Sequence, residues 1–214
     1  MGLRINTNVA GLKTTRILRN STLALNKSLE RLSSGLRINT AGDDAAGLAI
    51  AEGFRSVNLA AAVAQRNAQD GINLVQTAEG ALSETVNILQ RIRELAVQLE
   101  VDELIDQIDS IANDTEFNGL FPLAAAVNLT LQVGARATNT ISVNFATAAT
   151  AAGLGVNGLL ISHPTVLATG QTNAQNALAT LDAALTTVNQ QRSTLGAIQN
   201  RLEFTITTLQ IQEE

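Results

Sequence analysis

Apolar residues recur at helical spacing over the first 36 residues. The steps between them are mostly threes, fours and sevens, with one interruption between Lys13 and Arg16. The positions are Ile5, Val9, Leu12, Leu18, Leu25, Leu29, Leu32 and Leu36. Burying one leucine is worth about 1.5–3 kcal/mol, so such a row of side chains calls for a helical partner. The pattern predicts an N-terminal helix that packs against other helices.

The next segment predicts a sharp turn and the start of a second helix. Gly35 and Gly42 supply the backbone freedom that a turn needs. Thr40, Asp43 and Asp44 carry side-chain oxygens that can accept hydrogen bonds from the first N–H groups of a helix. We expect that helix to open at Asp43 or Asp44, with all three side chains as caps.

Two further apolar stripes predict a long antiparallel pair of helices. The first stripe comprises Phe54, Val57, Ala61, Ala64, Ala68, Val75, Ala78, Leu82, Val86, Leu89 and Ala96. The second comprises Leu178, Leu181, Leu185, Val188, Leu195, Ile198, Leu202, Ile206 and Leu209. Because Gly71 and Gly80 each cost about 1 kcal/mol of helix propensity, we expect a neighbour to pack tightly against both. The predicted class is mainly α, a coiled-coil-like helical rod with an N-terminal helical arm.

A small β element interrupts the rod. Val127, Leu129, Leu131 and Val133 alternate with polar residues, as do residues 141–145, and residues 134–139 lie between the two runs. Alternation of this kind predicts a β-hairpin. We expect an arm and elbow at 1–42, a rod formed by 43–112 and 171–214, and a hairpin excursion at 113–170.

The sequence after Gln98 lacks turn residues, although the rod helix needs a turn there in order to fold back. No Gly, Pro or Asn follows Gln98 until Asn113, so a single helix over 44–112 would be about 100 Å long. We therefore expect residues to be missing between Gln98 and Leu99, with Cα atoms much further apart than the 3.8 Å of a trans peptide. The C-terminal stripe also stops at Glu214 without a capping residue.

Composition and charge exclude several classes of function. The net charge is −5 and aromatic residues make up 2% of the chain, which argues against nucleic-acid binding. No apolar span fits a membrane, and the first residues lack the apolar core of a cleaved signal peptide. His163 is the single histidine and lies beside Pro164 in a low-complexity stretch, while acidic pairs such as Asp43 and Asp44 fit helix caps. We therefore expect no enzyme, and no catalytic, cofactor or metal site.

Several collinear motifs resemble bacterial flagellin, the subunit of the flagellar filament. They begin with Arg4-Ile-Asn-Thr-Asn8, Leu32-Ser-Ser-Gly-Leu-Arg-Ile-Asn39, Asp43-Asp-Ala-Ala-Gly-Leu-Ala-Ile50 and Arg66-Asn-Ala-Gln-Asp-Gly-Ile72. They continue with Thr77-Ala-Glu-Gly-Ala-Leu82, Leu89-Gln-Arg-Ile-Arg-Glu-Leu-Ala-Val-Gln98, Thr115-Glu-Phe-Asn-Gly119, Gln132-Val-Gly134 and Leu195-Gly-Ala-Ile-Gln-Asn-Arg-Leu202. The chain departs from the family in lacking a rod linker after Gln98, the C-terminal arm and the outer variable domains.

The resemblance implies a structural, self-assembling protein. It implies a filament homopolymer outside the cell, exported without a cleaved signal peptide, with the export apparatus and the hook-associated and cap proteins as further partners. The arm positions from Ile5 to Leu36 named above would then form the subunit interface. The alternatives are a hook-associated junction protein of the flagellum, a helical bundle that does not assemble, and an enzyme.

The resemblance also points to a vertebrate partner. The flagellin-sensing Toll-like receptor recognises the family's rod segment, which places Arg91, Leu95 and Glu100 as candidate contacts in this chain. The competing interpretation is that Arg91 and Leu95 contact neighbouring subunits in the filament.

Overall fold

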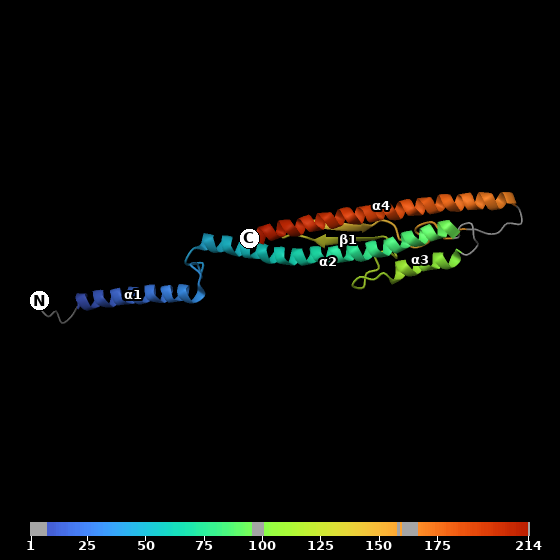
Figure 1. Ribbon diagram of the computed structural model, residues 1–214. Coiled ribbons are helices and arrows are strands. Elements are labelled where there is room, and N and C mark those ends of the chain that lie inside the picture. Colours follow the sequence, from blue (N-terminus) through green and yellow to red (C-terminus); the bar gives the residue numbers. More distant parts are fainter. Residues whose placement is uncertain (1–7, 96–100, 158, 160–166, 214) are drawn as a thin grey trace. The chain divides into compact units, whose positions relative to one another are not determined.

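The computed structural model describes residues 8–95, 101–157, 159 and 167–213. Four helices and two strands follow one another in the order α1, α2, α3, β1, β2, α4 (Figure 1). The chain divides into two compact units, residues 1–57 and 58–214. The predicted mainly α class with a small β-hairpin is confirmed.

The first unit contains α1 (Val9–Ser34), which has well-formed caps at both ends. At its start, the side chain of Asn8 accepts a hydrogen bond of 2.9 Å from the backbone N–H of Gly11. At its end, Gly35 adopts a left-handed conformation with φ of 70°, and its N–H donates to the carbonyl of Arg31 at 2.9 Å. These caps fix the helix length by satisfying backbone groups that would otherwise lack partners.

The turn after α1 leads into α2 (Ala45–Leu95), as the sequence predicted. Asp44 is the N-cap, since its side chain accepts a hydrogen bond of 2.9 Å from the N–H of Gly47. The predicted capping role was wrong for Thr40 and Asp43. The hydroxyl of Thr40 donates to Asp43, and the carboxylate of Asp43 faces back to the N–H groups of Asn39 and Thr40.

The second unit is organised around α2, from residue 58 onward, and α4 (Leu167–Glu213). The two helices run antiparallel (Figure 1). Arg192 and Glu79 form an ion pair of 3.5 Å, Arg93 and Asp182 form one of 3.3 Å, and Leu209 packs near the other end of the seam. The buried residues of the seam include Ala61, Ala64, Ala68, Val75, Ala78, Leu82, Leu89, Leu181, Val188, Leu195, Leu202 and Leu209. The predicted antiparallel pairing is confirmed.

Three members of the predicted stripes are exposed and lie outside this buried seam, whereas Leu185 and Ile206 are half-buried against it. Phe54 and Val57 lie in the first unit and are 66% and 42% exposed, while Leu178 near the start of α4 is 36% exposed. Ala96 lies outside the described residues.

The two glycines of α2 differ in their surroundings. A side chain at Gly71 would meet Leu131 of the hairpin and, at 3.2 Å, Leu202 of α4, so tight packing there is confirmed. Nothing lies within 4 Å of a side chain placed at Gly80, so the prediction for that position was wrong. Only Gly71 is required by a neighbour that approaches the helix closely.

A third helix, α3 (Asp102–Asp114), shows that residues 44–112 do not form one uninterrupted helix. Its apolar face buries Ile105, Ile108 and Ala112 in the same core as α2 and α4. Gln98 and Leu99, on which the prediction of missing residues depended, lie outside the described part of the chain.

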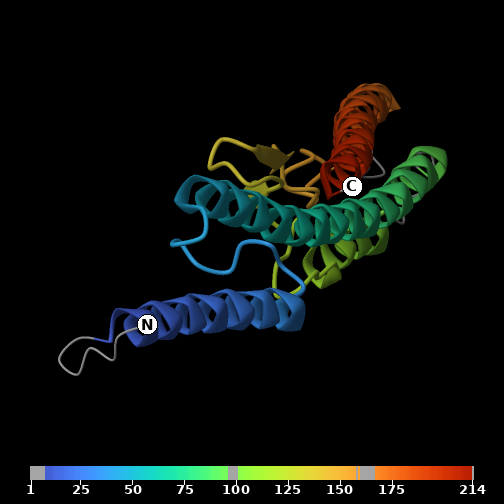
Figure 2. The same cartoon turned by 90° about the vertical axis from the view of Figure 1, so that its left-hand side faces the viewer.

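The predicted hairpin is formed by β1 (Val127–Gln132) and β2 (Thr140–Phe145). Val127 pairs with Phe145 and Leu131 with Ile141, in antiparallel register. The hairpin lies alongside α2 and α4 in both views (Figures 1 and 2), and Ile141, Val143 and Phe145 enter the common core. The side-chain amide of Asn67 on α2 donates to the carbonyl of Gln132 at 2.9 Å.

The chain after the hairpin is also packed into the core. Ala149, Ala151 and Val156 are fully buried. The side chain of Asp109 on α3 accepts a hydrogen bond of 2.7 Å from the N–H of Ala151, and Gln191 on α4 donates to the carbonyl of Thr147 at 2.7 Å. The low-complexity sequence of this segment gave no sign of such burial. The expected turn at His163 and Pro164 lies outside the described residues.

Candidate assembly interface

Helix α1 exposes its large apolar side chains to solvent. Seven of the eight predicted interface positions are described, and their side chains are between 54% and 81% exposed. They are Val9, Leu12, Leu18, Leu25, Leu29, Leu32 and Leu36. No residue of α1 is buried, and the eighth position, Ile5, lies outside the described residues.

The apolar side chains of α1 occupy two faces of the helix. At about 100° per residue, Leu18, Leu25, Leu29 and Leu32 fall within roughly 60° of one another. Val9 and Leu12 fall on the opposite side, so the predicted single stripe becomes two. Leu23 joins this second face and is 60% exposed. Its spacing does not fit the leucine stripe, so the sequence pattern did not indicate it. A helix with apolar residues on opposite faces needs partners on more than one side.

The polar residues of α1 are mainly basic. The helix contains five cationic residues and one acidic residue, Glu30, although the whole chain has a net charge of −5. The cationic residues are Lys13, Arg16, Arg19, Lys27 and Arg31. Long basic side chains keep their charge in water while their stems cover apolar surface. The arm is thus both apolar and positively charged.

Asp43 connects the end of α1 to the turn that follows. Its carboxylate forms ion pairs with Lys27 and with Arg31, the latter at 3.5 Å, and the side chain is only 7% exposed. It also accepts hydrogen bonds from the N–H groups of Asn39 at 3.3 Å and Thr40 at 3.4 Å. The charged form of Asp43 is stabilised first by the hydrogen bond from Lys27 and then by those from the backbone N–H groups of Asn39 and Thr40. The pKa of Asp43 therefore lies well below its ordinary value.

The start of α2 adds a further exposed apolar surface to the first unit. Ile50, Phe54 and Val57 are 61%, 66% and 42% exposed. Their spacing of four and three places them on one face of the helix. The sequence stripe predicted Phe54 and Val57 as part of the seam, and did not single out Ile50.

The predicted receptor residues lie near the end of α2. Arg91 is exposed and forms an ion pair of 2.8 Å with Glu94 one turn away. Leu95 is the last residue of α2 and is half-buried. Glu100 lies outside the described residues.

Among the described residues, no three His, Cys, Asp or Glu side chains are grouped as metal ligands. None of the helices described here is long and apolar enough to cross a membrane.

An antiparallel helical core together with an apolar helix that buries none of its own residues defines a helical structural protein. Comparison with known families agrees: residues 5–104 match the bacterial flagellin N-terminal helical region, and residues 178–214 match the bacterial flagellin C-terminal helical region. The chain belongs to the bacterial flagellin family.

Curated relatives support this assignment over almost the whole chain. The flagellin of Bacillus subtilis strain 168 is 42% identical over 254 aligned residues, which cover 99% of this chain and 84% of the relative. A flagellar filament 31.3 kDa core protein of Treponema maltophilum is 38% identical over 236 residues, which cover 98% of this chain and 82% of the relative. Both alignments are longer than the 214-residue chain, so each relative contains residues without a counterpart here.

Solved structures show the same fold. The crystal structure of Bacillus cereus flagellin matches with a TM-score of 0.55 and 27% identity, covering 67% of this chain and 88% of that one. A structure described as a flagellar hook-associated protein from Vibrio parahaemolyticus matches with a TM-score of 0.65 over 79% of this chain and 95% of that one. At 16% identity, this second match shows the fold alone. Taken with the curated relatives, the chain is a structural subunit of the flagellar filament.

Proposed function

We propose that α1 is the surface through which copies of this chain assemble into the filament. The observation that supports this most directly is the exposure of the six predicted positions on α1 and of Leu36 just after it, at 54–81% of each residue's surface. Covering them contributes on the order of 10 kcal/mol, which is comparable with the 4–15 kcal/mol that association costs in lost freedom. A head-to-tail contact that does not close on itself produces a helical polymer.

The same proposal covers the cellular location of the filament and the proteins that it contacts. The assembled protein is extracellular, it leaves the cell without a cleaved signal peptide, and it contacts the export apparatus and the hook-associated and cap proteins at stages before or during assembly. It acts through its interfaces and is not an enzyme. Family membership supports these statements.

The test replaces apolar surface on α1 without changing helix propensity. The double variant Leu25→Gln/Leu29→Gln keeps good helix formers at both positions, and Asn20→Gln/Asn26→Gln is a matched control at two exposed polar positions of the same helix. The critical concentration for filament formation, measured by sedimentation, rises at least tenfold for the leucine variant and stays at the wild-type value for the control. An unchanged critical concentration for the leucine variant would contradict the proposal.

The hook-associated alternative is supported by the fold match alone. Electron microscopy of the wild-type protein separates the two functions. Long filaments grown from seeds support the filament subunit, whereas growth that stops at short caps supports the junction protein.

We further propose Arg91, Leu95 and Glu100 as contacts for the vertebrate Toll-like receptor, by resemblance to the family. Arg91 is accessible for such a contact, and Leu95 is partly accessible. In a receptor reporter assay, Arg91→Ala and Leu95→Ala reduce activation, and Gln76→Ala, at an exposed position on the same helix, leaves it unchanged. Activation by both contact variants at the wild-type level would remove these residues from the proposal.

A further inference from the structure

We propose that the loop at residues 114–121 of one copy binds in a groove between the hairpin and α4 of a second copy. The inference rests on the proposed assembly function and names a second contact for it, away from α1. Both surfaces belong to the unit formed by residues 58–214.

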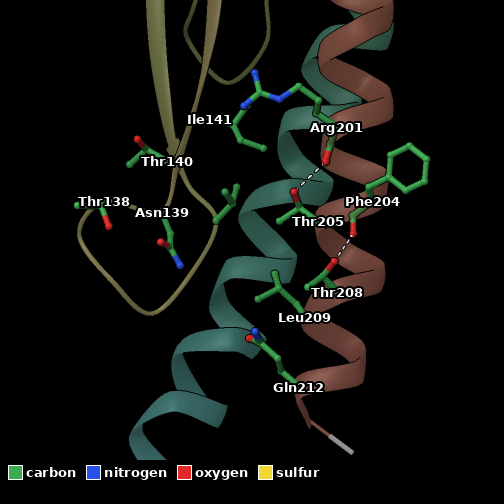
Figure 3. A pocket seen from close by; sticks show the side chains of 11 residues that line it. Thr138, Asn139, Thr140, Ile141, Arg201, Phe204, Thr205, Thr208, Leu209 and Gln212 are labelled. Atoms are coloured by element: carbon green, nitrogen blue, oxygen red, sulfur yellow. Dashed lines mark hydrogen bonds between the residues drawn. The ribbon is translucent and has the colours of Figure 1, made fainter.

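The groove lies between the turn of the hairpin and the last three turns of α4 (Figure 3). Its volume is about 450 Å³, many times the roughly 30 Å³ that one water occupies, so it has room for side chains. The buried side chains of Val133, Ile141 and Leu209 provide apolar walls. Phe204 lies at the edge, points away from the hairpin and is 75% exposed. The groove is thus an apolar recess with an aromatic rim.

A positive charge lines the groove. The guanidinium group of Arg201 extends from α4 toward Ile141 in Figure 3, and no acidic side chain of the described residues lies within ion-pair distance of it. Arg136, in the hairpin turn, is exposed and likewise forms no ion pair within the described part of the chain. An acidic partner would therefore find one cation, Arg201, in the lining of the recess and a second, Arg136, exposed in the nearby hairpin turn.

The loop after α3 presents the complementary features. Leu120 and Phe121 are 38% and 44% exposed, and the acidic residues Asp114 and Glu116 precede them with exposed side chains. The sequence contains no Lys or Arg between Arg93 and Arg136. An aromatic side chain with nearby carboxylates is suited to an apolar recess that carries cations.

The loop is also held in one shape. Backbone hydrogen bonds of 2.8 and 3.0 Å join Phe117 and Leu120 across a tight turn. Asn118 and Gly119 adopt positive φ of 51° and 79°, and the carboxylate of Glu116 accepts a hydrogen bond of 3.1 Å from the N–H of Gly119. A shape that exists before binding lowers the entropy lost on association.

A second copy is the occupant that these charges favour. Within the same chain, α1 is basic and would be repelled by Arg201, whereas the loop is acidic. Because loop and groove are different surfaces of one unit, each copy can offer its loop to one neighbour and its groove to another. Such a contact is head-to-tail and extends a polymer.

Cysteine cross-linking tests the contact directly, because the chain contains no cysteine. Leu120→Cys places a thiol beside Phe121, Thr208→Cys places one in the groove, and Gln76→Cys is an exposed control on α2. Two single variants are mixed under assembly conditions, oxidised, and separated on a non-reducing gel. Because each chain carries one thiol, a disulfide between different variants must join two copies.

The expected result is a Leu120→Cys/Thr208→Cys heterodimer at least ten times more abundant than the Leu120→Cys/Gln76→Cys heterodimer, and reversed by reductant. Equal yields of the two heterodimers would overturn the proposed contact, whether or not the variants form filaments. Filaments with equal yields would leave the proposed function intact, whereas absence of filaments from wild-type protein would count against that function itself.

Charge reversal provides the second measurement. Arg201→Glu alone raises the critical concentration for assembly, and adding Asp114→Arg in the same chain restores it, because every loop then meets a groove of opposite charge while Glu116 keeps its hydrogen bond to Gly119. Failure of the second change to restore assembly would overturn the assigned pairing.

Discussion

The carboxylate of Asp43 holds the turn between α1 and α2 through five groups at once, one of which is the hydroxyl of Thr40. It pairs with Lys27 and Arg31 on the last turns of α1, and it accepts N–H groups from Asn39 and Thr40. The neighbouring Asp44 acts in the other direction, as the cap of α2. Two adjacent aspartates thus have different roles because their backbone positions differ: Asp43 holds the turn, and Asp44 caps the helix.

This environment gives the turn a defined response to acid. The pKa of Asp43 is lower in the folded chain than the ordinary value of about 3.9, so its contribution to stability is complete above that value and is lost only as the pH falls through the lower, folded pKa. An NMR titration of the Asp43 carboxyl carbon should therefore show a midpoint clearly below 3.9. A midpoint at or above 3.9 would show that the ion pairs and N–H groups do not stabilise the charged form.

Asp43→Asn provides a second prediction at this scale. The variant loses both ion pairs, so hydrogen exchange at the N–H groups of Asn39 and Thr40 becomes faster. Asp44→Asn is the matched control, because Asn caps helices as well as Asp does and the N–H of Gly47 keeps its acceptor. Slow exchange at Asn39 and Thr40 in Asp43→Asn would contradict the role given to this carboxylate.

Among the elements, the contrast between Gly71 and Gly80 offers a direct measurement of packing. Gly80→Ala adds a methyl group where nothing lies within 4 Å, so it should stabilise the protein by about 0.4–1 kcal/mol and raise the melting temperature. Gly71→Ala gains the same helix propensity but pushes against Leu131 and Leu202, so it should gain less or destabilise. Thermal unfolding followed by circular dichroism checks both. Equal shifts for the two variants would mean that the hairpin does not press on α2.

The helices and the hairpin could be predicted because their apolar spacing follows a period of 3.6 or 2 residues. The pattern could not show how far a seam is actually covered: Phe54 and Val57 continue the stripe of Ala61 but lie exposed. Nor could it distinguish Gly71 from Gly80, since that depends on a side chain 60 residues away in β1. Burial of Ala149 and Val156 was missed because a non-periodic segment carries no local signal of its contacts.

The assembly surface shows a similar limit. The exposed leucines of α1 were identifiable from spacing and from family resemblance, whereas the groove with Arg201 was not. Its walls come from residues 133–141 and 201–212, which meet only after the hairpin packs against α4. A surface built from one helix leaves a periodic pattern in the sequence, whereas a surface built from two elements leaves none.

For the whole molecule, α1 has no buried residues whereas the second unit has a buried core, so the two should differ in their resistance to proteolysis. Trypsin should cleave the free chain first at the exposed Lys13, Arg16 and Arg19 of α1, while the core of α2 and α4 survives longer. In filaments the same sites should become resistant, if α1 is covered by neighbours. Mass spectrometry of the first fragments measures this. Equal cleavage rates at these sites in free and assembled protein would argue against a covered arm.

The antiparallel seam also has a consequence for folding. Ala61 and Ala64 depend for burial on Leu209, so one half of this contact is made nearly 150 residues after the other. At about 5–20 residues per second, synthesis separates the two halves by roughly 7–30 s. The hairpin and α3 can form on α2 during that interval, but their shared core stays open on one side until α4 arrives. During synthesis from the N-terminus, most of the chain is therefore made before this part of the core can close.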